Sequence, residues 1–121
     1  MFTAKTTMKV HELFEDEERS VLSEIGKQPD HFEGNFACSR NKLTSLEGSP
    51  SSIGGSFYCN NNHLTSLEGA PPSVGKNFNG STNRFTSLHN IHKHIKKIGA
   101  VADFQGNPIK SHVLEIGRAH V

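Results

Sequence analysis

The stretch NNNHLTSLEGAPPSV, residues 60–74, decides the fold because the chain repeats it on both sides. Residues 39–53 read SRNKLTSLEGSPSSI, and residues 81–95 read STNRFTSLHNIHKHI. A fixed period in this range predicts a solenoid, in which each unit buries its apolar side against the next unit. Five positions keep a spacing of 21 residues: Phe36, Phe57 and Phe78; Cys38, Cys59 and Gly80; Asn41, Asn62 and Asn83; Leu43, Leu64 and Phe85; Leu46, Leu67 and Leu88.

Within one unit, Phe57 and Cys59 are separated by one residue, which predicts a short strand with both side chains in the core. The spacing Phe-x-Cys-x-x-Asn-x-Leu-x-x-Leu resembles the short leucine-rich repeats of bacterial and tailed-phage proteins, which carry N-x-L-T-S-L-E-G-A-P. The resemblance covers about residues 32–114. It implies a repeat solenoid of the α/β, leucine-rich-repeat-like class. We therefore expect short parallel strands, mostly irregular return legs and a cap formed by an N-terminal helix.

The expected boundaries follow the repeat. The terminal stretch EIGRAHV resembles the translation of a sequencing adapter, which indicates read-through at the end of a fragment of environmental DNA. A fourth unit is incomplete, so about three and a half repeats are expected. The segments are an N-terminal helical cap (1–31), repeats at 32–52, 53–73, 74–97 and 98–114, and the adapter-like end (115–121).

Two segments are expected to be helical. Apolar residues near the N-terminus recur at three, four and seven, which predicts one or two amphipathic helices ending at GKQPD. These residues are Val10, Leu13, Phe14, Val21, Leu22 and Ile25. This region would cover the open end of the first coil, or, given its acidic run Glu15–Glu18, would dock on another protein. In the third return leg, Ile91, Ile95 and Ile98 also fall at helical spacing.

Asparagine recurs where each strand ends. We expect a buried ladder there, because an amide can satisfy backbone groups that turn away from the strand, and an unpaired buried amide costs about 1–3 kcal/mol. Its members are Asn41, Asn62, Asn83 and Asn107. Gly48 and Gly69 are expected to adopt backbone conformations closed to other residues.

Composition narrows the classes of function. The 121 residues carry a net charge of +1, which is far from the basic footprint of nucleic-acid binding, so a nucleic acid partner is not expected. No apolar run approaches membrane-spanning length. Two cysteines without a secretory signal predict a cytoplasmic protein, in the host cytoplasm if a phage encodes it.

The residues between the core positions form the predicted concave strand face, where repeat proteins commonly bind partners. It has three rows: Asn35, Ser56, Asn77 and Val101; Ala37, Tyr58, Asn79 and Asp103; Ser39, Asn60, Ser81 and Gln105. Tyr58 is its sole aromatic residue and the expected anchor of a protein partner. The residues expected to contact that partner are Tyr58, Asn60, Asn79, Ser81, Asp103 and Gln105. The alternative is that Asn and Ser only keep the face soluble.

A second candidate surface is a basic edge formed by Lys42, His63 and Arg84, one in each coil. It could attract an acidic protein or a phosphate backbone, although three charges without aromatic residues between them are more typical of a solvated edge. Cys38 and Cys59 are expected to be small core residues. His89, His92 and His94 lack further zinc ligands, so no metal or other cofactor is expected.

No nucleophile with a neighbouring base, paired carboxylates or phosphate-binding loop is evident, so the chain is not expected to be an enzyme. The favoured function is a module that binds a protein through the concave face. The alternative is a structural or assembly component of a phage-like particle. A third, less favoured hypothesis is the recognition arm of an enzyme whose catalytic domain lies outside this sequence.

Overall fold

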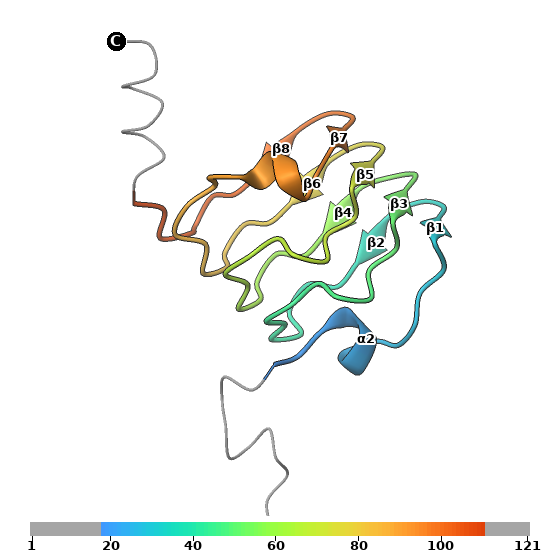
Figure 1. Cartoon of the computed structure of the whole chain (residues 1–121), viewed down its shortest axis with the longest axis horizontal. Coiled ribbons are helices and arrows are strands. Elements are labelled where there is room, and N and C mark those ends of the chain that lie inside the picture. The colour runs from blue at the N-terminus through green and yellow to red at the C-terminus, as the bar shows by residue number, and fades with distance from the viewer. Residues whose placement is uncertain (1–17, 111–121) are drawn as a thin grey trace, which may run out of the picture.

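The computed structural model describes residues 18–110 (Figure 1). Its helices are short: α2 (Val21–Glu24) is one α-helical turn and η2 (Ile91–Lys93) is one 3₁₀ turn. Each strand has two residues. The strands are β1 (His31–Phe32), β2 (Phe36–Ala37), β3 (Ser52–Ile53), β4 (Phe57–Tyr58), β5 (Ser73–Val74), β6 (Phe78–Asn79), β7 (Lys97–Ile98) and β8 (Ala102–Asp103).

The strands form two four-stranded parallel sheets, with the orders β1-β3-β5-β7 and β2-β4-β6-β8. Each coil therefore gives one strand to each sheet, and Figure 1 shows the coils stacked in a single row. In the second sheet Phe36 pairs with Phe57 and Phe57 with Phe78, which is the register that the repeat predicts. The chain is thus a parallel-strand solenoid, as expected from the period.

The core lies between the two sheets and consists of the repeated apolar side chains. Phe57, Phe78, Leu43 and Leu64 are fully buried. The rings of Phe57 and Phe78 lie 5.3 Å apart, so neighbouring coils contact through like residues. Burial of each such side chain stabilises the fold by about 1.5–3 kcal/mol. A coil without neighbours would expose its apolar side chains to water, so the stability of the fold depends on the stacking of coils.

The return legs contain a feature that the sequence did not reveal, the sheet β1-β3-β5-β7. Its strands carry one inward residue each, and Ile53 and Val74 are buried. A two-residue strand with one apolar side chain is too short to show alternation. At the turns between the legs, Gly48 and Gly69 have φ of 96° and 89°, and Asn90 takes the equivalent place with φ of 65°.

Within the described residues, the predicted N-terminal helical region contains a single helical turn, α2. Ser20 caps α2, because its hydroxyl accepts from Ser23 N at 3.0 Å, and Gly26 follows with φ of 114°. Val21 is buried, but Leu22 and Ile25 are 47% and 40% exposed, so one of these three predicted core residues is in the core. Residues 10–17, including Val10, Leu13 and Phe14, lie outside the described residues.

The segment still covers part of the first coil, because its backbone bonds to the first return leg. Thr44 N donates to Arg19 O at 2.8 Å, and Leu22 N donates to Glu47 O at 2.9 Å. In Figure 1, α2 lies beside this first leg. These bonds take up backbone groups that a longer helix would need for its own ladder.

The prediction of a helical third return leg was wrong beyond a single turn. Ile91 begins the 3₁₀ turn, but Lys96 N and Lys97 N both donate to Pro72 O, which ends helical bonding. Ile98 then pairs with Val74 in the first sheet. Pairing with the preceding coil therefore prevails over the helical spacing of the isoleucines.

Candidate binding face

Two rows of side chains that bond to the backbone flank the sheet β2-β4-β6-β8. The first, which we name the inner ladder, consists of Asn41, Asn62, Asn83 and Asn107. Asn62 Nδ2 donates to Cys59 O in its own coil at 3.0 Å and to Cys38 O in the preceding coil at 3.1 Å. Its Oδ1 accepts from Asn41 N and Leu43 N, both at 2.9 Å. One amide thus satisfies backbone groups of two coils.

The same bonds recur along the stack. Asn83 Nδ2 donates to Cys59 O and Gly80 O, and Asn107 Oδ1 accepts from Asn83 N and Phe85 N. Asn62 and Asn83 are only 5% and 7% exposed, whereas the two end members are half-buried. The inner ladder therefore holds neighbouring coils together and is not a surface for a partner.

The second row, which we name the outer ladder, consists of Asn35, Ser56 and Asn77. Ser56 N donates to Asn35 Oδ1 at 2.8 Å, Asn77 N donates to Ser56 Oγ at 3.1 Å, and Val101 N donates to Asn77 Oδ1 at 3.1 Å. The sequence placed these residues on the binding face, but Ser56 is only 4% exposed. The signal that was missed is a side-chain acceptor just before each strand, which Asn and Ser both supply.

We name the outer surface of this sheet the strand face. It consists of the outward residues of β2, β4, β6 and β8, which are Ala37, Tyr58, Asn79 and Asp103, and of a second row two residues further along the chain. In it Tyr58 lies next to Asn79, and Asn79 lies next to Asp103. All three side chains are half-buried. The following row is more exposed toward its end and contains Ser39, Asn60, Ser81 and Gln105.

Several polar groups of the strand face are already bonded within it. Asn79 Oδ1 accepts from Ser81 N at 3.0 Å and from Ser81 Oγ at 2.7 Å. Asp103 Oδ1 accepts from Gln105 N at 3.0 Å, and Asn60 Nδ2 donates to Asn61 Oδ1 at 2.8 Å. These bonds fix the side chains, while the amide Nδ2 of Asn79 and the second oxygen of Asp103 have no partner among residues 18–110.

A shallow hollow of about 330 Å³ opens in the strand face. It combines the Tyr58 ring with Val101, which is 62% exposed. Its lining is Tyr58, Asn77, Phe78, Asn79, Val101 and Asp103. Of the predicted contact residues, the hollow thus brings together Tyr58, Asn79 and Asp103, whereas Asn60, Ser81 and Gln105 are not among its lining residues.

The predicted basic edge occupies neighbouring coils. His63 N donates to Leu43 O and Arg84 N donates to Leu64 O, both at 2.8 Å, so these positions follow one another along the stack. Lys42 and Arg84 are exposed and His63 is half-buried. Lys42 has φ of 57°, a left-handed conformation that the other two do not share, so the edge is not a regular repeat.

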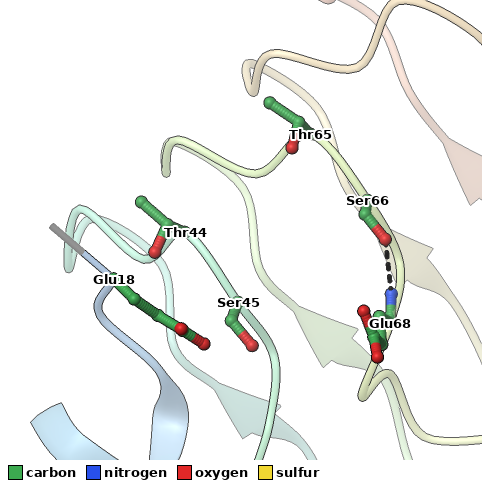
Figure 2. Close-up of a pocket in the computed structure, with 6 residues that line it drawn as sticks. All are labelled: Glu18, Thr44, Ser45, Thr65, Ser66 and Glu68. Carbon is green, nitrogen blue, oxygen red and sulfur yellow. Dashed lines mark hydrogen bonds between the residues drawn. The ribbon is translucent and has the colours of Figure 1, made fainter. Parts of the chain in front are cut away.

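A second hollow, of about 300 Å³, lies on the side of the return legs (Figure 2). It is lined by Glu18, Thr44, Ser45, Thr65, Ser66 and Glu68. Three of its four hydroxyls accept from backbone N: Ser66 Oγ from Glu68 N at 3.0 Å, the bond drawn in Figure 2, Ser45 Oγ from Glu47 N at 3.0 Å and Thr44 Oγ1 from Arg19 N at 2.7 Å. Because this lining has no apolar or aromatic side chain, the strand face is the better candidate.

Two cysteine thiols lie in the core. Cys38 and Cys59 are free and fully buried, and burial raises the pKa of Cys38 to about 12 and also raises that of Cys59. Protonated thiols are poor nucleophiles and poor metal ligands. Residues 18–110 contain no group of three or more His, Cys, Asp or Glu side chains that could hold a metal ion, His89, His92 and His94 included.

Over the same residues, the structure contains no helix with the length and apolar character needed to cross a membrane. The chain was also compared with protein families, curated proteins and solved structures, and none of them matches it.

Proposed function

We propose that the chain binds a partner protein through the strand face, with Tyr58 as its anchor. The observation that carries this proposal is the hollow of about 330 Å³, in which the Tyr58 ring and the exposed Val101 lie beside Asn79 and Asp103. Interfaces commonly centre on a large aromatic side chain with polar groups around it.

The chemistry of the hollow supports a protein as the ligand. Val101 and the ring of Tyr58 offer an apolar surface that an aliphatic or aromatic side chain would cover. The Asn79 Nδ2 group and the second Asp103 oxygen, which have no partner within residues 18–110, would donate to and accept from a backbone or polar side chain. Tyr58 loses few rotamers on binding, because its side chain is already half-buried.

The first experiment identifies the contact. A photoreactive phenylalanine analogue replaces Tyr58 in one variant and Thr65, which is exposed on the side of the return legs, in another. Both variants are expressed in bacterial cells that carry the candidate partners, and cross-linked products are identified by mass spectrometry. We expect a discrete adduct from position 58 alone. Equal adducts from both positions would refute a specific strand face.

The second experiment measures the affinity of the partner so identified. Tyr58→Ala is expected to weaken binding about 30-fold, because an anchor tyrosine contributes about 2 kcal/mol. Thr65→Ala is the matched control and should leave the affinity within about 2-fold. Unchanged affinity in Tyr58→Ala, with the folded state intact by circular dichroism, would show that the partner binds elsewhere.

A further inference from the structure

Within residues 18–110, the two ends of the solenoid carry outer strands whose bonding groups complement each other. β1 and β2 are the outer strands at one end of the described sheets, and β7 and β8 are the outer strands at the other. An unpaired parallel edge is a template for another strand. We propose that a second copy of this chain stacks on these edges head to tail, with its β1 and β2 beside β7 and β8 of the first copy.

The direction of the backbone bonds fits such a stack. In the first sheet, Gly75 N donates to Ile53 O and Gly99 N donates to Val74 O, so each later coil donates to the earlier one. Continuing this pattern, Glu33 N of the second copy would donate to Ile98 O. In the second sheet the direction is reversed, as in the bond from Phe78 N to Val101 O. Ala102 N would therefore donate to Asn35 O of the second copy.

The inner ladder is incomplete in the matching places. Within residues 18–110, Asn41 Oδ1 accepts no hydrogen bond, although Asn62 Oδ1 and Asn107 Oδ1 each accept two. At the other end of that stretch, Asn107 N makes no bond. Stacking would pair these two groups. Asn107 N would donate to Asn41 Oδ1 of the second copy, as Asn83 N donates to Asn107 Oδ1 within one chain.

Shape fits as well. A hollow of about 390 Å³ opens at the last described coil, and Ala102 and Phe104 are among its lining residues. Ala102 continues the row of Phe36, Phe57 and Phe78, and the ring of Phe104 stacks on Phe78 at 5.7 Å in place of a phenylalanine at position 102, so Phe36 of the second copy would pack against Phe104. The half-buried Ile98 would meet the half-buried Phe32 in the first sheet.

Charge favours this orientation over a symmetric one. Residues 18–33 contain four acids and two bases, whereas residues 93–110 contain four lysines and one aspartate. Two ends of the same kind would repel each other. Lys96 holds the register position that Asp30 holds in the first coil, so stacking places these two exposed side chains on neighbouring strands.

Among the described residues, stacking has a cost at Lys110. Lys110 N donates to Thr86 O in the preceding coil. Arg19 likewise lies one coil before Thr44, whose N donates to Arg19 O, so Arg19 of the second copy and Lys110 of the first would fall at the same position in the stack. Arg19 of the second copy would therefore displace Lys110 and its hydrogen bond. The net gain still includes two strand edges and the ladder bond of Asn41.

The test is the association of the full chain, measured by sedimentation velocity from about 1 µM to 1 mM at low salt. A head-to-tail contact does not close on itself, so we expect species beyond the dimer to accumulate with concentration. Added salt of 0.5 M should reduce association, because the charge contribution is screened. A chain that stays monomeric up to 1 mM overturns the proposal, and this includes the case in which its own residues outside 18–110 cover the edges. A closed dimer overturns it too.

Charge variants identify the contact. Lys96→Glu and Asp30→Lys are each expected to weaken association about 5- to 10-fold, and the double variant should recover most of it because the pair is restored in reverse. Lys76→Glu, an exposed residue in the middle of the stack, is the matched control and should change association less than 2-fold. All of these side chains are exposed, so folding is unaffected; failure of the double variant to recover would refute the stated register.

Discussion

The inner and outer ladders flank the same sheet, yet they differ in how strictly they demand one residue. The inner ladder has Asn in every described coil, and each central amide both donates and accepts. The outer ladder alternates Asn, Ser and Asn, and its bonds between coils use only one acceptor per side chain. The number of backbone groups that a side chain must satisfy therefore decides how freely it can vary.

Burial explains the rest of the difference. Asn62 and Asn83 lie in the interior, where water cannot replace a lost bond. Asn35 and Asn77 are exposed, so water is available to the backbone groups beside them. Four predictions test this contrast, in order of decreasing change in stability.

Asn62→Leu is expected to be the most damaging change. It leaves Asn41 N and the buried Leu43 N without an acceptor. It also removes one donor each from Cys38 O and Cys59 O, which Asn41 Nδ2 and Asn83 Nδ2 still contact. Each unsatisfied donor costs about 1–3 kcal/mol, so a loss of about 4 kcal/mol is expected in urea unfolding. The control is Asn60→Leu, which removes one surface bond and should cost less than about 1 kcal/mol. Equal effects of both changes would contradict the role given to the inner ladder.

The same substitution in both ladders gives the sharpest comparison. Asn83→Ser shortens an inner side chain so that it no longer reaches both Cys59 O and Leu64 N, and should cost about 2 kcal/mol. Asn77→Ser copies the residue that the outer ladder already uses at Ser56 and should cost less than about 0.5 kcal/mol. Thermal or urea unfolding of the pair measures both. A larger loss in Asn77→Ser would reverse the order.

The thiols next to the inner ladder predict a dependence on pH. Burial raises the pKa of Cys38 from 9.0 to about 12, so above pH 9 the unfolded chain loses protons that the folded chain keeps. The free energy of unfolding should therefore fall as pH rises from about 9 toward 12, by about 1.4 kcal/mol for this thiol at pH 10. Urea unfolding at pH 8 and pH 10 measures the fall. Cys38→Ala should show a correspondingly smaller fall; an identical one would mean that the thiol is not buried.

Ser56→Ala should have a small but measurable effect. It removes the acceptor of Asn77 N at the outer ladder, and one hydrogen bond contributes about 1 kcal/mol. Ser39→Ala, on the same sheet, serves as the control and should be neutral in urea unfolding. If Ser56→Ala were also neutral, the outer ladder would be a consequence of the fold with no part in its stability.

Much of the fold was predictable because its decisive residues are identical from coil to coil. Phe57, Cys59 and Leu64 recur at one spacing, and a side chain that must stack on its own copy leaves a clear record in the sequence. The sheet β1-β3-β5-β7 left no such record, because a strand such as Ser73–Val74 has one inward residue. The candidate site was predictable in part: the period placed Tyr58, Asn79 and Asp103 together, but it also included Ser56, which the outer ladder buries.

The spacing of the repeat is enough to specify that the chain is a solenoid, which residues fill its core and where Asn recurs. How far each helix extends and which polar side chains remain available depend instead on contacts between coils. Ile91 and Ile95 have helical spacing, yet the donors of Lys96 and Lys97 bond to Pro72 O in the preceding coil and end the turn. Such bonds join residues about one repeat apart in the sequence. Whether a backbone group bonds locally or to a neighbouring coil depends on which groups the stacking of coils places nearby.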